Sequence, residues 1–254
     1  MKILLPPSEG KTTPDDAGTP LDLESLTLPE LTDARRTALD AVIAASARAD
    51  AQQIFKVGSR AMAEVHANRD MPSAPTAPAW QVYTGVLYEA LAARSLPQAT
   101  MRRAADDVLI FSGLFGVTGF TDPIPAYRCA MDITLPQLGR LSTFWKQHLA
   151  APLDQTLAGE LLVDCRSGSY QKPFPGDPQR VLQVNNFTEK NGQRKVVTHF
   201  AKAARGELAG MLLRAEPAPE TIDDVVDVAC TRWLVELRPA QGRKPHQLDL
   251  IASG

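Results

Sequence analysis

Residues able to bind a phosphate group lie near the start of the chain, in the stretch MKILLPPSEGKTT. Gly10, Lys11 and Thr12 have the order that ends a nucleotide phosphate loop, but such a loop also needs a glycine five residues before Gly10. That position is Leu5, and the two prolines after it lack the N–H donors that curl around a phosphate. We therefore predict that a short strand ends here in a polar cluster rather than a nucleotide loop, with a capped surface turn as the simpler alternative. The cluster consists of Ser8, Glu9, Lys11, Thr12 and Thr13.

Two other apolar runs also end in small and polar residues. VLIF, residues 108–111, leads into Ser112, and LLVD, residues 161–164, leads into a polar turn that ends at Tyr170. If the carboxyl ends of these strands converge, they form a polar cleft that contains both cations and carboxylates. The glycines that would let a ligand approach the backbone closely are Gly113, Gly116 and Gly119.

A basic segment follows later, in THFAKAARG, residues 198–206. His199, Lys202 and Arg205 lie three residues apart, on one side of a predicted helix start. From residue 190 to residue 205 the chain has five Lys or Arg residues and no acidic residue. Free N–H groups and cations at a helix start attract anions such as phosphate, although an ordinary solvated helix face has the same composition.

Two residues in the stretch AYRCAMD follow a pair of prolines that fix their loop. Arg128 could bind a phosphate or a carboxylate through its planar guanidinium group. Tyr127 could stack on a base or supply a hydroxyl group. A buried tyrosine beside a structural salt bridge is the alternative interpretation.

The composition excludes several classes of protein and site. The net charge is −2, so nucleic-acid binding would need a local basic patch. The three cysteines lie far apart without a C-x-x-C pair, which favours a reducing compartment and disfavours structural zinc. Cys165, beside Arg166, could have a lowered pKa, but a buried cysteine at a strand end is more often inert. H-E-x-x-H, G-x-S-x-G and G-x-G-x-x-G are absent, and no stretch has the length of a membrane span. We expect a cytoplasmic protein with no cofactor, no metal site and no membrane contact.

The hydrophobic pattern predicts one α/β domain over residues 1–254, with a central sheet flanked by helices. The predicted helices cover residues 28–51, 51–68 and 201–214, with further helices from about Leu87 and around 144–149. The predicted strands cover residues 2–5, 108–111 and 161–164, a hairpin of 181–187 with 196–200 around the turn 189–192, and a final strand in CTRWLVELRPA.

Five segments in a fixed order resemble the YaaA family of peroxide stress proteins, and they spread over most of the chain. They are the N-terminal strand with Pro-Ser-x-x-Lys-Thr, VYTGVLYEAL, FSGLFGVTGFTDPIPAYRCAMD, the pair FW, and FAKAARG. The resemblance implies a single α/β domain of unusual topology, with a mixed sheet, a positively charged cleft and a helix-hairpin-helix-like element. It also implies DNA binding and a role in limiting iron-driven oxidative damage during peroxide stress. The residues that match the family's motifs are Ser8, Lys11, Thr12, Tyr83, Thr84, Gly85, Ser112, Gly113, Leu114, Gly116, Tyr127, Arg128, Met131, Lys202, Arg205 and Gly206.

Glu9 departs from the family pattern, because it places a carboxylate where other members have a small neutral residue. This weakens a purely phosphate-binding interpretation, as does the net negative charge. The cleft predicted from these motifs contains Ser8, Glu9, Thr12, Thr84, Ser112, Tyr127 and Tyr170 as its polar residues.

Two functions from different classes fit these residues. In a DNA-binding protein, Lys11, Arg128, Lys202 and Arg205 neutralise phosphates, and the turn at Gly113 and Gly116 contacts the DNA backbone.

In an enzyme acting on a small phosphorylated or nucleobase-containing substrate, Lys11 serves as general acid or electrostatic clamp, Glu9 as base and Tyr127 as proton donor. Arg128 and Arg205 then anchor the anion. A deep pocket would favour the enzyme, and an open groove roughly 20 Å wide would favour DNA. Direct iron binding ranks last, because the histidines and carboxylates lack facial-triad spacing.

Overall fold

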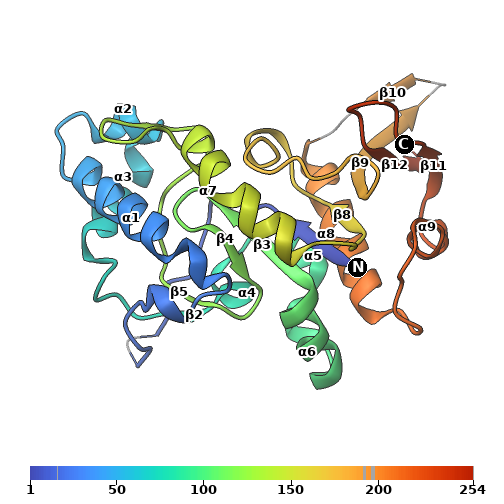
Figure 1. Cartoon of the computed structure of the whole chain (residues 1–254), viewed down its shortest axis with the longest axis horizontal. Coiled ribbons are helices and arrows are strands. Elements are labelled where there is room, and N and C mark those ends of the chain that lie inside the picture. The colour runs from blue at the N-terminus through green and yellow to red at the C-terminus, as the bar shows by residue number, and fades with distance from the viewer. Residues whose placement is uncertain (16, 191–192, 196–197, 254) are drawn as a thin grey trace.

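The computed structural model describes residues 1–15, 17–190, 193–195 and 198–253. Its centre is an eight-stranded mixed sheet, in the order β11-β12-β9-β8-β1-β3-β4, with β10 paired to β9 (Figure 1). The strands are β1 (Lys2–Leu5), β3 (Val108–Ser112), β4 (Gly116–Gly119), β8 (Leu162–Asp164), β9 (Val181–Lys190), β10 (Gln193–Lys195), β11 (Leu234–Arg238) and β12 (His246–Ser253).

The middle of this sheet is parallel and its edges are antiparallel. β1 pairs in parallel with both β3 and β8, β8 with β9, and β9 with β12. β3 turns back into β4, and β11 lies antiparallel to β12. Two small sheets, β2 (Ala77–Pro78) with β5 (Pro123–Ile124) and β6 (Thr134–Leu135) with β7 (Gly139–Arg140), order the loops beside it.

Helices lie around the sheet and at both ends of the molecule. α1, α2 and α3 form one end, α9 lies at the other beside β11 and β12, and α7 crosses between them (Figure 1). The helices are α1 (Thr32–Ser46), α2 (Ala51–Phe55), α3 (Met62–Ala67), α4 (Ala79–Val82), α5 (Val86–Leu91), α6 (Gln98–Asp107), α7 (Leu141–Thr156), α8 (Thr198–Arg214) and α9 (Ile222–Cys230). None of these helices combines the length and the apolar character needed to cross a lipid bilayer.

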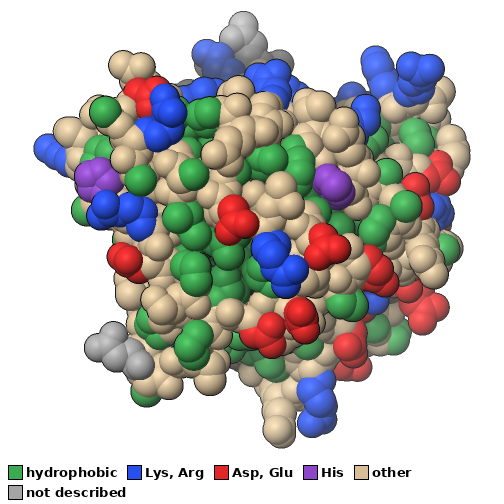
Figure 2. Space-filling model, turned by 60° about the vertical axis from the view of Figure 1, so that its left-hand side comes forward, with side chains coloured by type: hydrophobic (Ala, Val, Ile, Leu, Met, Phe, Trp, Pro, Cys, Tyr) green, Lys and Arg blue, Asp and Glu red, His purple; other side chains and the backbone are tan. Residues whose placement is uncertain are grey.

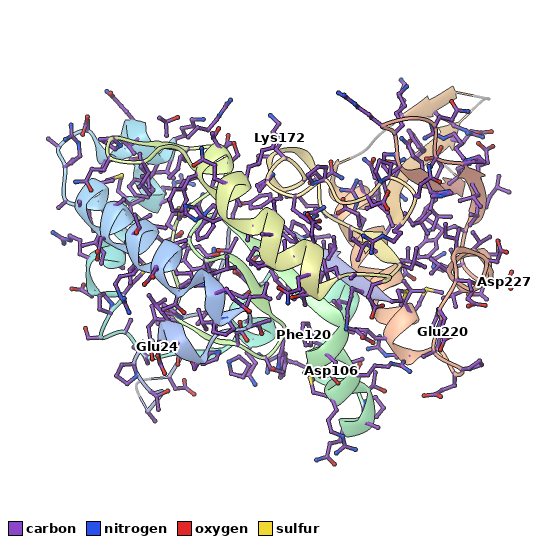
Figure 3. The ribbon with its side chains drawn as sticks, viewed as in Figure 1. Glu24, Asp106, Phe120, Lys172, Glu220 and Asp227 are labelled. Carbon is purple, nitrogen blue, oxygen red and sulfur yellow. The ribbon has the colours of Figure 1, made fainter. Side chains whose placement is uncertain are left out.

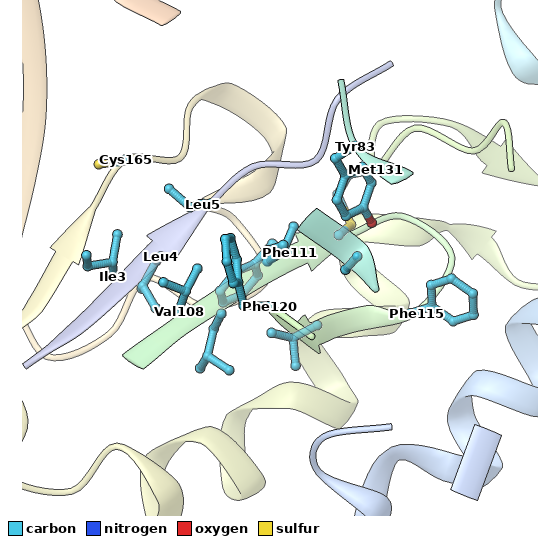
Figure 4. Close-up of a cluster of buried hydrophobic side chains, with 14 of the residues drawn as sticks. Ile3, Leu4, Leu5, Tyr83, Val108, Phe111, Phe115, Phe120, Met131 and Cys165 are labelled. Atoms are coloured by element: carbon cyan, nitrogen blue, oxygen red, sulfur yellow. The ribbon is translucent and has the colours of Figure 1, made fainter. Parts of the chain in front are cut away.

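The sequences of β1, β3 and β8 are continuous apolar runs because these strands lie in the core. Ile3, Leu4 and Leu5 are fully buried, as is Phe111 on the neighbouring strand (Figure 4). Strands in the parallel part of a sheet are covered on both faces, so they carry apolar residues without alternation. Burial of these side chains fixes where the polar residues after each strand leave the sheet.

The α/β class and the strands at 2–5, 108–111 and 161–164 are confirmed. The predicted helix over 51–68 is wrong as one element, because Lys56 has φ 53° and the chain breaks into α2 and α3 around Gly58. The glycine-rich run after β3 forms β4, which sequence reasoning read as a turn. The helix predicted over 28–51 is shorter, at 32–46, and that around 144–149 is longer, at 141–156.

The hairpin prediction is corrected in its second half. Its return strand is β10, residues 193–195, and residues 198–200 begin α8 instead. The turn residues 191–192 and residues 196–197 lie outside the described residues. The strand predicted in CTRWLVELRPA is β11, but β12 follows it and inserts between β11 and β9.

Candidate functional site

The carboxyl ends of three parallel strands meet at one edge of the sheet. Leu5 at the end of β1 lies beside Ile110 of β3, and Leu4 lies beside Asp164 of β8. The polar segments that follow these strands therefore leave the sheet side by side. The polar cleft was predicted on the condition that the carboxyl ends of these strands converge, and they do.

Two adjoining cavities lie at this edge, and we call them together the cleft. The first, of about 210 Å³, has eleven lining residues. They are Ser8, Glu9, Lys11, Phe55, Lys56, Val57, Arg128, Cys129, Ala130, Asp132 and Tyr170. The second, of about 500 Å³, shares five of these residues and extends to Lys202 and Arg205.

The second cavity takes the rest of its wall from three segments. The segments are Pro6–Pro7 after β1, Thr84–Tyr88 at the start of α5, and Ser167–Ser169 after β8. The segments come from residues far apart in the sequence, so the cavity exists only in the folded chain. Of the predicted site residues, the structure brings eight to the cleft. They are Ser8, Glu9, Lys11, Thr84, Arg128, Tyr170, Lys202 and Arg205.

Lys11 lies at the base of the first cavity, where its amine contacts carbonyl groups and aromatic rings. The Nζ atom donates to the carbonyl of Ser8 at 2.8 Å and to that of Glu9 at 3.4 Å. It lies 4.2 Å from the ring centre of Tyr127 and 5.5 Å from that of Tyr83. Burial, together with the nearby positive charge of Arg128, lowers the pKa of Lys11 to about 7. Lys11 therefore changes its charge near neutral pH.

A chain of hydroxyl groups lies beneath Lys11. The hydroxyl of Ser112 accepts N–H bonds from Leu114 and Phe115, so its own proton is directed to Tyr127, 2.7 Å away. The hydroxyl of Tyr127 in turn lies 2.8 Å from that of Tyr83. Burial raises the pKa of both tyrosines well above its ordinary value, so both phenols stay protonated. This buried network orients the rings against which the Lys11 amine lies.

Arg128 is fixed through its backbone and its side chain. The buried side chain of Asn68 accepts from the Arg128 N–H and donates to the Arg128 carbonyl, both at 2.9 Å. The guanidinium group then forms ion pairs of 3.2 Å with Glu9 and with Glu64. The charge of Arg128 is thus compensated by two carboxylates. The ion pair with Glu64 was not predicted from the sequence.

Lys202 and Arg205 reach the cleft because α8 packs unusually close to α5. A side-chain carbon at Gly206 would lie 1.9 Å from the carbonyl oxygen of Leu87, and one at Gly210 would lie 2.6 Å from that of Leu91. These two glycines let the helices touch. Gly85, at φ 89°, supplies the turn that begins α5. Gly206, which matches a motif of the family, therefore positions the two cations by allowing this close packing.

The polar turn after β8 is shaped by a buried ion pair. Arg166 donates to both carboxylate oxygens of Asp164, at 2.8 and 3.0 Å, and also to the carbonyl of Phe174. These contacts hold the turn that carries Ser167, Gly168 and Ser169 into the cleft. Burial raises the pKa of Cys165 to about 12, so the alternative of a reactive thiolate is wrong.

The cations of the cleft outnumber its carboxylates. Lys56 is compensated, since its Nζ lies 3.4 Å from the carboxylate of Asp132. Among the described residues, Lys202 and Arg205 form no ion pair; Lys202 is exposed and Arg205 donates to the carbonyl of Val184 at 3.0 Å. On the face seen in Figure 2, basic side chains lie mostly along the upper edge, and acidic side chains gather towards the lower right. Positive charge without a carboxylate partner therefore occurs at α8, beside the larger cavity.

Some predicted site residues lie elsewhere. Thr12 is exposed outside both cavities, and Ser112 and Tyr127 lie beneath the cleft rather than in its lining. Gly113 and Gly116 are buried, and added side chains there would collide with the backbone at Cys129 and with the ring of Trp145. The space beside these two glycines is filled by other parts of the chain, so the prediction that a ligand contacts them is wrong.

Sequence reasoning missed four residues that form or support the site. Lys56 was placed inside a helix, although the sequence Lys-Val-Gly is a signal for the break that brings it to the cleft. No motif recognised in the sequence includes Asp132, Glu64 or Asn68. Among the described residues, no three His, Cys, Asp or Glu side chains lie close enough together to hold a metal ion.

The fold and the site define a mixed α/β protein with a cation-bearing cleft at the carboxyl edge of its parallel strands. Residues 1–236 match the family model described as peroxide stress protein YaaA, and the chain belongs to that family. A UPF0246 protein of Streptomyces coelicolor is 38% identical, covering 99% of this chain and 98% of its own length. One from Corynebacterium efficiens is 41% identical over 90% of this chain and 91% of its own, and one from Marinomonas is 30% identical over 89% and 88%.

Proposed function

We propose that the cleft binds phosphate groups and that the protein binds DNA through it during peroxide stress. The observation that carries this proposal is the pair Lys202 and Arg205, which lie without an ion-pair partner among the described residues on the wall of the 500 Å³ cavity. Uncompensated cations beside a cavity are the groups that a phosphate neutralises. Binding through phosphates is independent of base sequence.

A second feature supports DNA over a smaller anion. The segment between α2 and α3 begins with Lys56 and Val57, which line the first cavity. It continues through the exposed Gly58 into a short 3-10 helix, Ser59–Ala61, where Arg60 is also exposed. An exposed turn between two short helices offers backbone N–H groups and a cation to a phosphate chain. The two short helices and their exposed connection replace the buried turn at Gly113 as the candidate for the helix-hairpin-helix-like element. DNA covered in this way would be exposed less to iron-driven oxidation, which is the protective role we propose.

The experiment is the binding of a short fluorescent duplex at several salt concentrations. Replacing Lys202 and Arg205 together by glutamine should reduce the slope of log affinity against log salt by about 2, since two phosphate contacts are lost. The matched control replaces Arg36 and Arg102 by glutamine, which changes the net charge equally on α1 and α6, outside both cavities. Salt-independent binding by the wild type, or an equal loss in the control, would refute the proposal.

The size of the cleft favours a second candidate, an enzyme acting on a small phosphorylated or nucleobase-containing substrate. A cavity of about 500 Å³ is in the range of small-molecule sites, which are about 300–1,000 Å³. In this function Lys11 and Glu9 serve as acid and base, and Arg128 and Arg205 anchor the anion. Tyr127 acts by orienting Lys11, because its hydroxyl is bound to Ser112 and Tyr83. A thermal-shift screen of nucleotides and phosphorylated sugars, repeated on the glutamine double variant, tests this function separately from duplex binding.

A further inference from the structure

We propose that Lys11 is a nucleophilic amine that forms an imine with the aldehyde of a phosphorylated pentose held in the cleft. The inference rests on the proposed phosphate binding by Lys202 and Arg205 and adds a covalent reaction to it.

The contacts of Lys11 suit an uncharged amine. Its Nζ atom has two hydrogen-bond acceptors, the carbonyls of Ser8 and Glu9, and a neutral amine has two N–H groups to donate. The nitrogen lone pair is then free to attack a carbonyl carbon. An ammonium group would have a third N–H, and the nearby tyrosine hydroxyls are already engaged with each other and with Ser112.

The charges around Lys11 act in both directions, and burial decides the balance. Arg128 disfavours the ammonium form, while Glu9, Glu64 and the faces of the tyrosine rings favour it. The two glutamates are bound to Arg128, so their charge is partly compensated. The resulting pKa of about 7 leaves a large fraction of Lys11 uncharged at neutral pH. Cys129, which also lines this cavity, is a thiol with its pKa raised to about 12 by burial and does not compete.

The substrate class follows from what the two cavities offer. Lys11 lines the smaller cavity, Lys202 and Arg205 line the larger one, and the wall between them is shared. A molecule that carries an aldehyde and a phosphate on a short carbon chain can satisfy both. Two sources have this chemistry: a free pentose phosphate, and the ring-opened deoxyribose at a site in DNA that has lost its base.

The reaction needs no oxidant and no cofactor. The Lys11 nitrogen forms a bond to the aldehyde carbon, and a proton moves from nitrogen to the former carbonyl oxygen. The carbon–oxygen bond then breaks as the hydroxyl takes the second proton of the nitrogen, so the oxygen leaves as water and the nitrogen is double-bonded to carbon as an imine. One amine and one aldehyde thus give one imine and one water.

Reductive trapping tests the inference directly. The protein is incubated at pH 7 with ribose 5-phosphate or with an oligonucleotide that carries one abasic site, and sodium cyanoborohydride reduces any imine to a stable amine. Peptide mass spectrometry then locates the adduct. We expect adduct at Lys11 in at least about tenfold excess over Lys56 and Lys172, because burial lowers the pKa of Lys11 and leaves much of its amine uncharged at pH 7.

Matched variants test whether the imine forms at Lys11. Lys11→Met should abolish trapping, and it should show an unaltered circular dichroism spectrum. Lys172→Met, on the exposed part of the loop after β8 (Figure 3), should trap as the wild type does. The two probes distinguish the sources, since the better substrate gives the faster trapping.

Duplex binding without an adduct at Lys11 would overturn the imine and leave phosphate binding intact. Adduct spread evenly over surface lysines would overturn it as well. If the wild type does not bind the duplex at all, the proposed function is refuted instead.

Discussion

Replacing Gly206 by alanine tests whether close packing of α5 and α8 builds the cleft. The added carbon would lie 1.9 Å from the Leu87 carbonyl oxygen, a backbone atom, and 2.8 Å from the Leu87 carbonyl carbon. Since such contacts are not found below about 3 Å, the helices must separate by about 1 Å. Overpacking against a backbone atom belongs to the upper part of the usual range, roughly 2–3 kcal/mol, and the gain from alanine in a helix is only about 1 kcal/mol.

We therefore expect Gly206→Ala to lower the free energy of unfolding by about 1–2 kcal/mol, measured by urea denaturation monitored by circular dichroism. The shift of α8 should also weaken duplex binding, because it moves Lys202 and Arg205 away from the Thr84–Tyr88 wall. The matched control is Gly58→Ala, where an added carbon meets no atom within 4 Å and φ is −74°. That variant should be neutral or stabilised by about 0.4–1 kcal/mol. A Gly206→Ala protein as stable as the wild type would refute the packing argument.

Three further predictions concern other parts of the site. Asn68→Ala should lower the free energy of unfolding by about 2–4 kcal/mol in urea titration, because it leaves the Arg128 N–H and carbonyl unpaired; unchanged stability would contradict that pairing. Lys11→Met should be more stable than the wild type at pH 6, and the difference should shrink between pH 7 and about 10. Between pH 7 and about 10 the lysine is protonated in the unfolded wild type but not in the folded one, so the stability of the wild type rises with pH. A difference that does not depend on pH would show that Lys11 has an ordinary pKa. Trp145→Phe removes the 2.8 Å bond from the indole N–H to the Gly113 carbonyl and should cost about 1–3 kcal/mol in the same titration; a neutral variant would mean that water replaces the indole.

The function of the cleft depends on which of its cations are free. Arg128 and Lys56 carry carboxylate partners, whereas Lys202 and Arg205 do not among the described residues. Phosphate affinity should therefore come mainly from α8, and Arg128 should contribute more to the shape and charge around Lys11. Glu9, which sequence reasoning treated as unfavourable for anion binding, acts through its ion pair with Arg128.

The sequence by itself determined the buried strands and the polar segments that follow them. Ile3, Leu4 and Leu5, like Val108 to Phe111, are uninterrupted apolar runs, which are typical of strands in a sheet covered on both faces. Because parallel strands end at a common edge, Ser8, Lys11 and Tyr170 could be placed together from sequence. The spacing of Lys202 and Arg205 on one helix face was also readable, since it depends on local geometry alone.

Tertiary structure alone decided which of these residues face a ligand. Gly113 and Gly116 have the composition of a ligand-binding turn, yet their space is filled by Cys129 and Trp145, which are distant in sequence. The charge state of Lys11 depends on burial between two tyrosine rings and on Arg128, and the free charge of Lys202 depends on which carboxylates lie within reach. Local sequence favours a strand or a helix through its hydrophobic pattern. Solvent exposure and electrostatic pairing depend on residues brought together across the chain, and no short stretch of this sequence specifies them.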